Sequence, residues 1–369
     1  MEVKEICRVI RLICCIEFMR MGVLWTISLL ISHLRQLLCN SNTFPRRRQP
    51  AQISAANPPV CIVTGATSGL GAAAAEALSK EGFFVILVGR SGHLLSKTMA
   101  EIRELNENAQ LEAFEVDLSS FSSIMKLKNS LMRWLLDMNM HPSIQLLINN
   151  AGILATSYRA TDDGFDEMMM TNYLGPFCLT KVLLPLLIDS PVPSRIVNVS
   201  SFTHRNVNDM QVDEELFYGK SYSDFRNYPF AQIYECSKLC ILLFSYELHR
   251  QLCKDKVSQM SVNIADPGAV KTNIMREIPH CLSQLAFSVL RLLGILHYPE
   301  KGVSSILDAA LAPPETSGMY FFGGKGRAIK SSPLSYDTML AKRLWGTSCD
   351  IFLELKRTYE KSTLISACD

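Results

Sequence analysis

The stretch VCIVTGATSGLGAAAAEALSKEG (60–82) constrains the fold of this chain more than any other. It combines a short β-branched run, a turn with glycines at 65, 69 and 71, and an alanine-rich helix. In such a strand–turn–helix unit, glycine permits a tight turn and a close backbone approach, and the helix N-terminus attracts a pyrophosphate. A glycine motif alone is weak, but its position directly between a strand and a helix predicts a dinucleotide site.

The rest of the body alternates apolar strands with helical stretches. Strands are expected at 82–91, 111–118, 144–152, 194–201, 260–268 and 317–324. This alternation predicts a parallel sheet with right-handed crossovers. No internal repeat and no second glycine-rich start occurs. We therefore expect one α/β domain over 59–350, a Rossmann-type doubly wound fold with a seven-stranded, mostly parallel sheet, followed by a tail at 351–369.

The charge distribution separates an N-terminal segment from this body. The whole chain carries a net charge of only +2, which argues against a nucleic-acid binder with a basic face. Residues 1–48 hold eight Lys and Arg against three Glu, so the remainder is slightly acidic. A basic, apolar head on an acidic body suggests membrane contact.

Residues 21–34 contain no Asp, Glu, Lys or Arg and are bracketed by Arg20 and Arg35. Fourteen helical residues reach only ~21 Å, short of the roughly 20 residues that a spanning helix needs, although flanking arginines can extend the reach. We expect an uncleaved membrane-anchor helix within 1–44, either spanning or interfacial; a targeting peptide and a soluble extension are the alternatives. Residues 45–58 are expected to be a linker, with Arg46–Arg48 at a cytoplasmic headgroup surface.

The twelve cysteines are scattered, with no C-x-x-C and no Cys/His cluster of metal-ligand spacing. Several lie inside apolar runs, where free cysteine behaves as a small hydrophobic residue. This usage predicts a reduced, cytosol-facing body without a metal site.

Arg90 ends the second expected strand, and no acid follows until Glu101. At this position an acid binds the ribose 2′-hydroxyl of NAD, whereas an arginine accommodates the 2′-phosphate of NADP. The residue favours NADP(H) over NAD(H); a solvated strand-end arginine is the alternative.

Tyr234 and Lys238 are four residues apart in IYECSK and share one face of a helix. Taken alone, they are more simply a surface tyrosine beside a solvated lysine. Their context changes this interpretation. Seven short motifs stand in a fixed order: TGATSGLG (64–71), DLSS (117–120), NNAG (149–152), TNYLGPF (171–177), RIVNVSS (195–201), YECSK (234–238) and DPGAVKT (266–272). From about 59 to 325 the chain resembles the short-chain dehydrogenase/reductases, and VNVSSFTH with the segment 299–324 is similar to their retinol-dehydrogenase-like branch.

The resemblance implies roles for four catalytic residues. Tyr234 would be the general acid/base, and Lys238 would hold the nicotinamide ribose and depress the pKa of the tyrosine. Ser201 would hydrogen-bond the substrate oxygen, and Asn172 would position a water in a proton relay. The residues that the resemblance places around the cofactor, besides Tyr234 and Lys238, are Gly65, Thr67, Ser68, Gly69, Leu70, Gly71, Arg90, Asp117, Leu118, Asn149, Ala151, Gly152, Pro267, Gly268, Val270 and Thr272.

Structural alternatives exist for three of these residues. Ser201 is a plausible turn residue at a strand end. Asn172 could cap or bend a helix, and Asp117 could be the N-cap of the helix that follows it.

Two further segments bear on the substrate. Residues 202–233 are longer than in compact family members and are expected to form a flap near the substrate mouth. Residues 280–297 carry a broad apolar stripe, which fits a core helix, a homodimer contact, or a lid that admits a lipid and touches the bilayer.

These features predict an NADP(H)-dependent oxidoreductase that interconverts an alcohol and a carbonyl on a retinoid, steroid or prenyl-type lipid. The expected location is the endoplasmic reticulum or another organelle membrane, with the catalytic domain facing the cytosol. An NADP(H)-sensing regulatory protein with weak turnover is the alternative, and an enzyme for small polar carbonyls is disfavoured by the apolar segments.

Overall fold

The computed structural model describes residues 9–10, 12, 14–38, 42–46, 57–219, 228–255 and 259–366, without the side chains of 36–38 and 365–366. The expectations for Arg47, Arg48 and most of the 45–58 linker lie outside these residues, as does the centre of the 202–233 insertion.

One eight-stranded sheet organises the chain, in the order β3-β2-β1-β4-β5-β6-β7-β8. Its strands are β1 (Val60–Thr64), β2 (Phe84–Gly89), β3 (Leu111–Glu115), β4 (Leu146–Asn149), β5 (Ser194–Val199), β6 (Met260–Asp266), β7 (Tyr320–Phe322) and β8 (Ala328–Ile329). The first seven are parallel, and β8 pairs antiparallel with β7. The doubly wound fold is confirmed, but the count of seven strands was one short, because a two-residue strand leaves no periodic signal.

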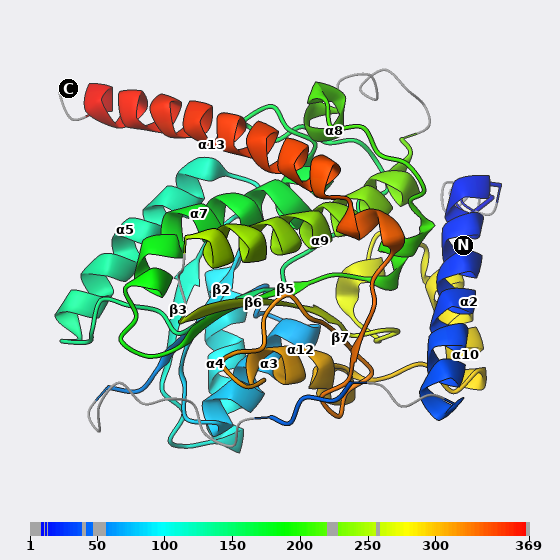
Figure 1. Cartoon of the computed structure of the whole chain (residues 1–369), viewed down its shortest axis with the longest axis horizontal. Helices are drawn as coiled ribbons and strands as arrows, with labels where there is room; N and C mark the ends of the chain where they lie inside the picture. The colour runs from blue at the N-terminus through cyan, green and yellow to red at the C-terminus, as the bar shows by residue number, and fades with distance from the viewer. Residues whose placement is uncertain are drawn as a thin grey trace.

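Helices cover both faces of the sheet (Figure 1). One face carries α3 (Gly69–Lys80), α4 (Gly92–Leu105), α11 (Pro299–Gly302) and α12 (Ser304–Ala310). The other carries α5 (Phe121–Asp137), α6 (Glu167–Met169), α7 (Gly175–Ile188), α9 (Phe230–Lys254) and α13 (Thr338–Ser366). Because both faces are covered, β1, β2, β5 and β6 are buried throughout.

Two apolar helices stand apart from these layers. Figure 1 shows α2 (Ile16–Leu38) and α10 (His280–Leu292) next to each other at one end of the sheet. Leu29 of α2 and Leu290 of α10 belong to one small buried cluster, with Phe202 and Phe322 from the strand ends. The expected N-terminal helix is therefore present, and it is docked on the domain.

Within the part of the chain that the structure describes, one helix is long and apolar enough to cross a membrane. It is the continuous helix Glu167–Ile188, which joins α6 and α7, and not α2. Because 78% of its apolar stretch is buried inside the domain, this helix has the burial of a core helix in an α/β protein.

Candidate active site

The glycine-rich turn after β1 is shaped by backbone contacts that exclude side chains. Gly65 and Gly69 have φ angles of +67° and +56°. A Cβ on Gly71 would lie 2.2 Å from the carbonyl oxygen of Gly65. These contacts require glycine and leave the N-terminus of α3 open, since the side chain of its N-cap residue Ser68 makes no capping hydrogen bond.

A cavity of about 1220 Å³ opens in front of this turn. Its walls come from residues at or after the carboxyl ends of β1 to β6 and from α2, α9 and α10. The turn lies where the strand order reverses between β1 and β4, the switch point at which open α/β sheets bind ligands. The volume exceeds that of an ordinary small-ligand pocket.

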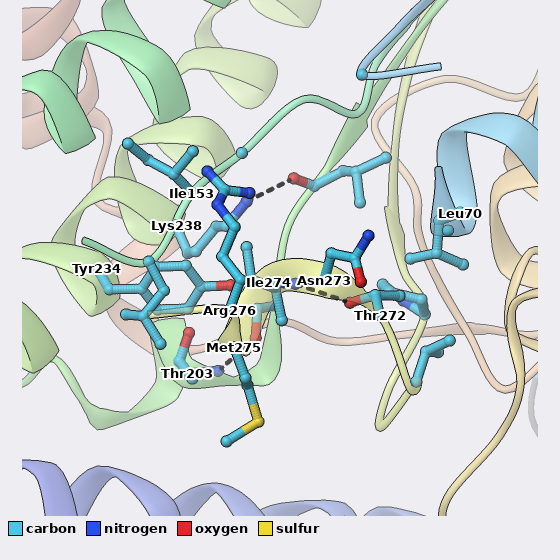
Figure 2. Close-up of a pocket in the computed structure, with 18 of the residues that line it drawn as sticks. Leu70, Ile153, Thr203, Tyr234, Lys238, Thr272, Asn273, Ile274, Met275 and Arg276 are labelled. Atoms are coloured by element: carbon cyan, nitrogen blue, oxygen red, sulfur yellow. Dashed lines mark hydrogen bonds between the residues drawn. The ribbon is translucent and has the colours of Figure 1, made fainter. Parts of the chain in front are cut away.

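Three expected catalytic residues converge on this cavity. Tyr234 and Lys238 lie on α9, and the Lys238 Nζ atom is 5.6 Å from the centroid of the Tyr234 ring. Ser201 follows β5, and its side chain hydrogen-bonds Tyr234. Figure 2 shows Tyr234 and Lys238 on one side of the cavity and Leu70 of the glycine-rich turn on the other.

Burial dominates the electrostatics of the pair. It raises the pKa of Tyr234 above its ordinary value of 10.0, the nearby Asp266 carboxylate adds to this, and the hydrogen bond from Ser201 opposes it. Burial lowers the pKa of Lys238 to about 8, so this side chain is mostly cationic at neutral pH. The expected depression of the Tyr234 pKa by Lys238 stays a prediction.

Asn172 is buried in a π-helical turn, η1 (Met170–Leu174). Its Oδ1 accepts from the Ile153 backbone N–H at 2.8 Å, and its Nδ2 donates to the Ile153 carbonyl at 2.9 Å and to Ser237 Oγ at 3.2 Å. The side chain thus ties the loop after β4 to α9. The proposed role in a water relay stays a prediction.

Arg90 lines the cavity at the end of β2, with its Nη1 atom 3.7 Å from Glu167 Oε1. The carboxylate of Glu115 accepts a hydrogen bond from the Gly92 backbone N–H at 2.8 Å, so it lies on the first turn of α4. Asp117 is the one acid among the described residues that line the cavity.

Asp117 itself is not the cap of the next helix. Its Oδ1 atom accepts from the backbone N–H of Ser119 at 2.8 Å and from its hydroxyl at 2.7 Å. The N-cap of α5 is Ser120, whose side chain accepts from Ser123 N. The N-cap alternative for Asp117 was therefore wrong, and Asp117 and Leu118 both line the cavity.

The residues 149–152 were expected to support both the cofactor and the central sheet, and the two asparagines divide these places. The Asn149 side chain donates to Thr180 and Asn198 inside the core and does not line the cavity. Asn150 lines the cavity beside Ala151 and Gly152 and donates from its Nδ2 atom to the Thr64 carbonyl at 2.9 Å. Two adjacent asparagines carry no sequence signal that tells which side chain points inward.

The segment after β6 contributes Pro267, Gly268, Val270 and Thr272, all of which line the cavity as expected. Asp266 was missed. It is buried, and it accepts hydrogen bonds from the Tyr320 hydroxyl at 2.5 Å and the Gly268 backbone N–H at 2.8 Å. Burial raises its pKa to about 6. The available signal was an acid at the end of a buried, apolar strand.

The substrate side of the cavity is mainly apolar. It is lined by side chains of α2 and α10 and by the segment 273–276, while the described part of 202–233 contributes only Thr203. The flap expected from 202–233 is thus not seen in the described parts of that segment. Tyr218 and Tyr228 pack away from the site, against Phe165 and Asp166 respectively.

Comparisons with known proteins agree with this geometry. The family model for short chain dehydrogenases matches residues 59–212. The chain is 34% identical to human polyprenol dehydrogenase over 299 residues, covering 79% of this chain and 84% of that protein. It is 32% identical to mouse retinol dehydrogenase 14 over 303 residues, covering 78% and 84% of the two chains.

Solved structures share the fold. An uncharacterized protein from Mycobacterium paratuberculosis matches with a TM-score of 0.59 and 26% identity, covering 85% of this chain and 98% of that one. The Pseudomonas aeruginosa RhlG complex with NADP matches with a TM-score of 0.56 and 21% identity, covering 74% and 97%.

Proposed function

The chain belongs to the short-chain dehydrogenase/reductase family, in its retinol-dehydrogenase-like branch, and from this premise we propose that it interconverts an alcohol and a carbonyl on a hydrophobic substrate with NADP(H). The observation that carries the proposal is the convergence of Ser201, Tyr234 and Lys238 on a cavity whose other end is the glycine-rich turn.

The residues present fit a nicotinamide dinucleotide. The backbone of the glycine-rich turn and the open N-terminus of α3 would hold the pyrophosphate, and a Cβ on Gly65 would already meet Ala151 Cα at 2.9 Å. When bound, the cofactor supplies or accepts the hydride. Lys238, cationic at neutral pH, would lie near its ribose.

Tyr234 would give a proton from its hydroxyl to the carbonyl oxygen during reduction and take one from the alcohol during oxidation. Its raised pKa favours the protonated acid, which suits reduction. For oxidation, the positive charge of the oxidised cofactor would have to favour the tyrosinate. Ser201 would donate a hydrogen bond to the oxygen on which charge develops.

The preference for NADP(H) rests on Arg90. Its half-exposed guanidinium lies at the end of β2, the strand end that faces the adenosine ribose in dinucleotide-binding folds. At that strand end the chain has Arg90 in place of the acid that would bind a ribose 2′-hydroxyl. Its Glu167 partner, 3.7 Å away and also paired with Arg159, is a weak competitor for a phosphate.

The proposal of a lipid substrate rests on α2 and α10. Both helices line the cavity with apolar side chains, and they also expose apolar side chains that do not line it, namely Ile16, Leu24, Ile31, Leu34 and Leu292. Two relatives are named for polyprenol and retinol, and both of these alcohols are apolar lipids, the substrate class proposed here.

The same outward apolar surface would contact an organelle membrane, such as that of the endoplasmic reticulum, with the catalytic domain in the cytosol. Arg291, which is exposed on α10, would meet lipid headgroups, whereas Arg276 lines the cavity. Arg46 is placed differently from our expectation: its Nε atom pairs with the buried carboxylate of Asp308 at 2.6 Å, so it is held on the domain.

A substrate panel tests the proposal. Full-length protein in detergent is incubated with NADPH and retinal, a steroid ketone, a C20 prenyl aldehyde or glyceraldehyde, and product alcohols are measured by mass spectrometry. We expect reduction of at least one apolar carbonyl and little of glyceraldehyde. Reduction of glyceraldehyde alone would contradict the proposed substrate class.

A further inference from the structure

We propose that the N-terminal helix α2 is a wall of the substrate chamber, and that Gly22 sets the size of substrate that this chamber admits. The inference rests on the proposed function and goes beyond it, because it assigns the N-terminal helix α2 a role in substrate selection.

The helix presents a defined face to the domain. Its buried or half-buried positions Phe18, Met21, Trp25, Leu29 and Ser32 recur at helical spacing. The Phe18 ring lies 5.4 Å from the ring of Phe230, the first residue of the helix that carries Tyr234. Leu29 is fully buried.

Polar contacts fix the position of this face at both ends. The Arg20 guanidinium pairs at 2.8 Å with the buried carboxylate of Glu235, the residue next to Tyr234. The other oxygen of Glu235 accepts from Asn206 Nδ2 at 2.6 Å. About three turns after Arg20, the Ser32 carbonyl and hydroxyl accept hydrogen bonds from Arg327, both at 3.3 Å. The register of α2 against the active site is therefore specified.

Gly22 interrupts the packing of the inward face. It lies one turn after Phe18 and two turns before Leu29, on the same side of the helix, but unlike them it is exposed. A Cβ built on Gly22 meets nothing within 4 Å, and the residue lines the cavity. Glycine disfavours a helix interior, so the helix carries a weak helix former at the point where the chamber is open.

Residues of α10, including Leu282, Leu285 and Ala286, line the same cavity. Because a Cβ at position 22 meets no atom within 4 Å, a larger side chain there would extend into the shared space. It would exclude bulky or branched chains before it affected small carbonyls, and it would leave the pyrophosphate position untouched, because that position lies at the glycine-rich turn after β1 and not on α2.

The test compares Gly22→Phe with Gly346→Phe. Gly346 is also a helical glycine with nothing within 4 Å of a built Cβ, but it lies on α13 and does not line the cavity. For each variant, kcat/KM is measured with NADPH and either a C20 prenyl aldehyde or n-hexanal, and the Kd of NADPH is measured by fluorescence.

We expect Gly22→Phe to lower kcat/KM for the C20 aldehyde about 10-fold or more, with hexanal turnover and the NADPH Kd nearly unchanged. Gly346→Phe should resemble the wild type with both aldehydes. Equal changes for the two aldehydes in Gly22→Phe, or none, would overturn the inference. If Gly22→Phe does not fold, Gly22→Leu is judged by the same criteria.

Direct binding separates this inference from the proposed function. A pyrene-labelled C16 alcohol is titrated into each protein in the presence of NADP+. If the wild type reduces neither aldehyde but binds the probe, and Gly22→Phe binds it about 10-fold more weakly, the chamber wall is supported while the proposed reaction fails. Equal probe affinity of Gly22→Phe and wild type would refute the role of Gly22 whatever the turnover.

Discussion

Replacing Asp266 with asparagine removes a buried carboxylate whose charge acts on both members of the catalytic pair. The carboxylate lies at the end of β6 and raises the pKa of Tyr234 and of Lys238. An asparagine has the same shape, and its Oδ1 atom can still accept from the Gly268 N–H. The variant therefore tests the charge with little change in packing.

The expected change in the free energy of unfolding follows from the pKa of Asp266 itself. Burial raises it from an ordinary value of 3.8 to about 6. That difference corresponds to about 3 kcal/mol between the protonated and ionised forms. Because the folded-state pKa lies above the unfolded-state value, the folded protein binds more protons between pH 4 and 6. The carboxylate thus costs stability progressively as the pH rises through that window.

The stability assay is equilibrium urea unfolding of wild type and Asp266→Asn, in detergent, at pH 4 and at pH 7.5. We expect the free energy of unfolding of the variant, relative to wild type, to be higher at pH 7.5 than at pH 4 by up to about 3 kcal/mol. A difference that does not change with pH would refute the reasoning.

The same variant should shift the pH dependence of activity to lower pH. Without the carboxylate, the pKa values of Tyr234 and Lys238 both fall. The pH dependence of alcohol oxidation should therefore begin its rise at lower pH than in the wild type. An unchanged profile would show that Asp266 does not act on the catalytic pair.

Three further predictions concern the cofactor site and the membrane. Arg90→Asp should shift the ratio of kcat/KM for NADPH and NADH towards NADH by about 10–100-fold, since a charge-assisted hydrogen bond is lost; an unchanged ratio would contradict the assignment of NADP(H). Gly71→Ala should abolish the thermal stabilisation by NADPH, because its Cβ would lie 2.2 Å from the Gly65 oxygen; wild-type stabilisation would show that the turn does not hold the cofactor. Deleting residues 1–44 should release the protein from membranes in a sedimentation assay, and a truncated protein that still pellets would place the membrane contact elsewhere.

The features that could be predicted from the sequence are local or serial. The glycine-rich turn lies in one continuous stretch of sequence, and β1 to β7 correspond to apolar runs that helical segments separate. The spacing of Tyr234 and Lys238 on one helix face is also local. These features predict the fold and the candidate catalytic pair before any long-range contact is known.

The features that were missed depend on contacts between distant residues. The docking of α2 rests on the Arg20–Glu235 pair, whose members are 215 positions apart. The choice between Asn149 and Asn150 depends on which side chain meets Thr180 across the core. The pKa of Tyr234 depends on burial, and a sequence motif carries no measure of desolvation.

The central claim is that Tyr234 exchanges a proton with a lipid carbonyl or alcohol, and Tyr234→Phe tests it most directly. The substitution removes the hydroxyl and keeps the ring beside the Lys238 ammonium. With NADPH and the apolar carbonyl that the wild type reduces, we expect kcat to fall about 10²–10⁴-fold while the Kd of NADPH stays within about 2-fold. Turnover comparable to the wild type would contradict the account.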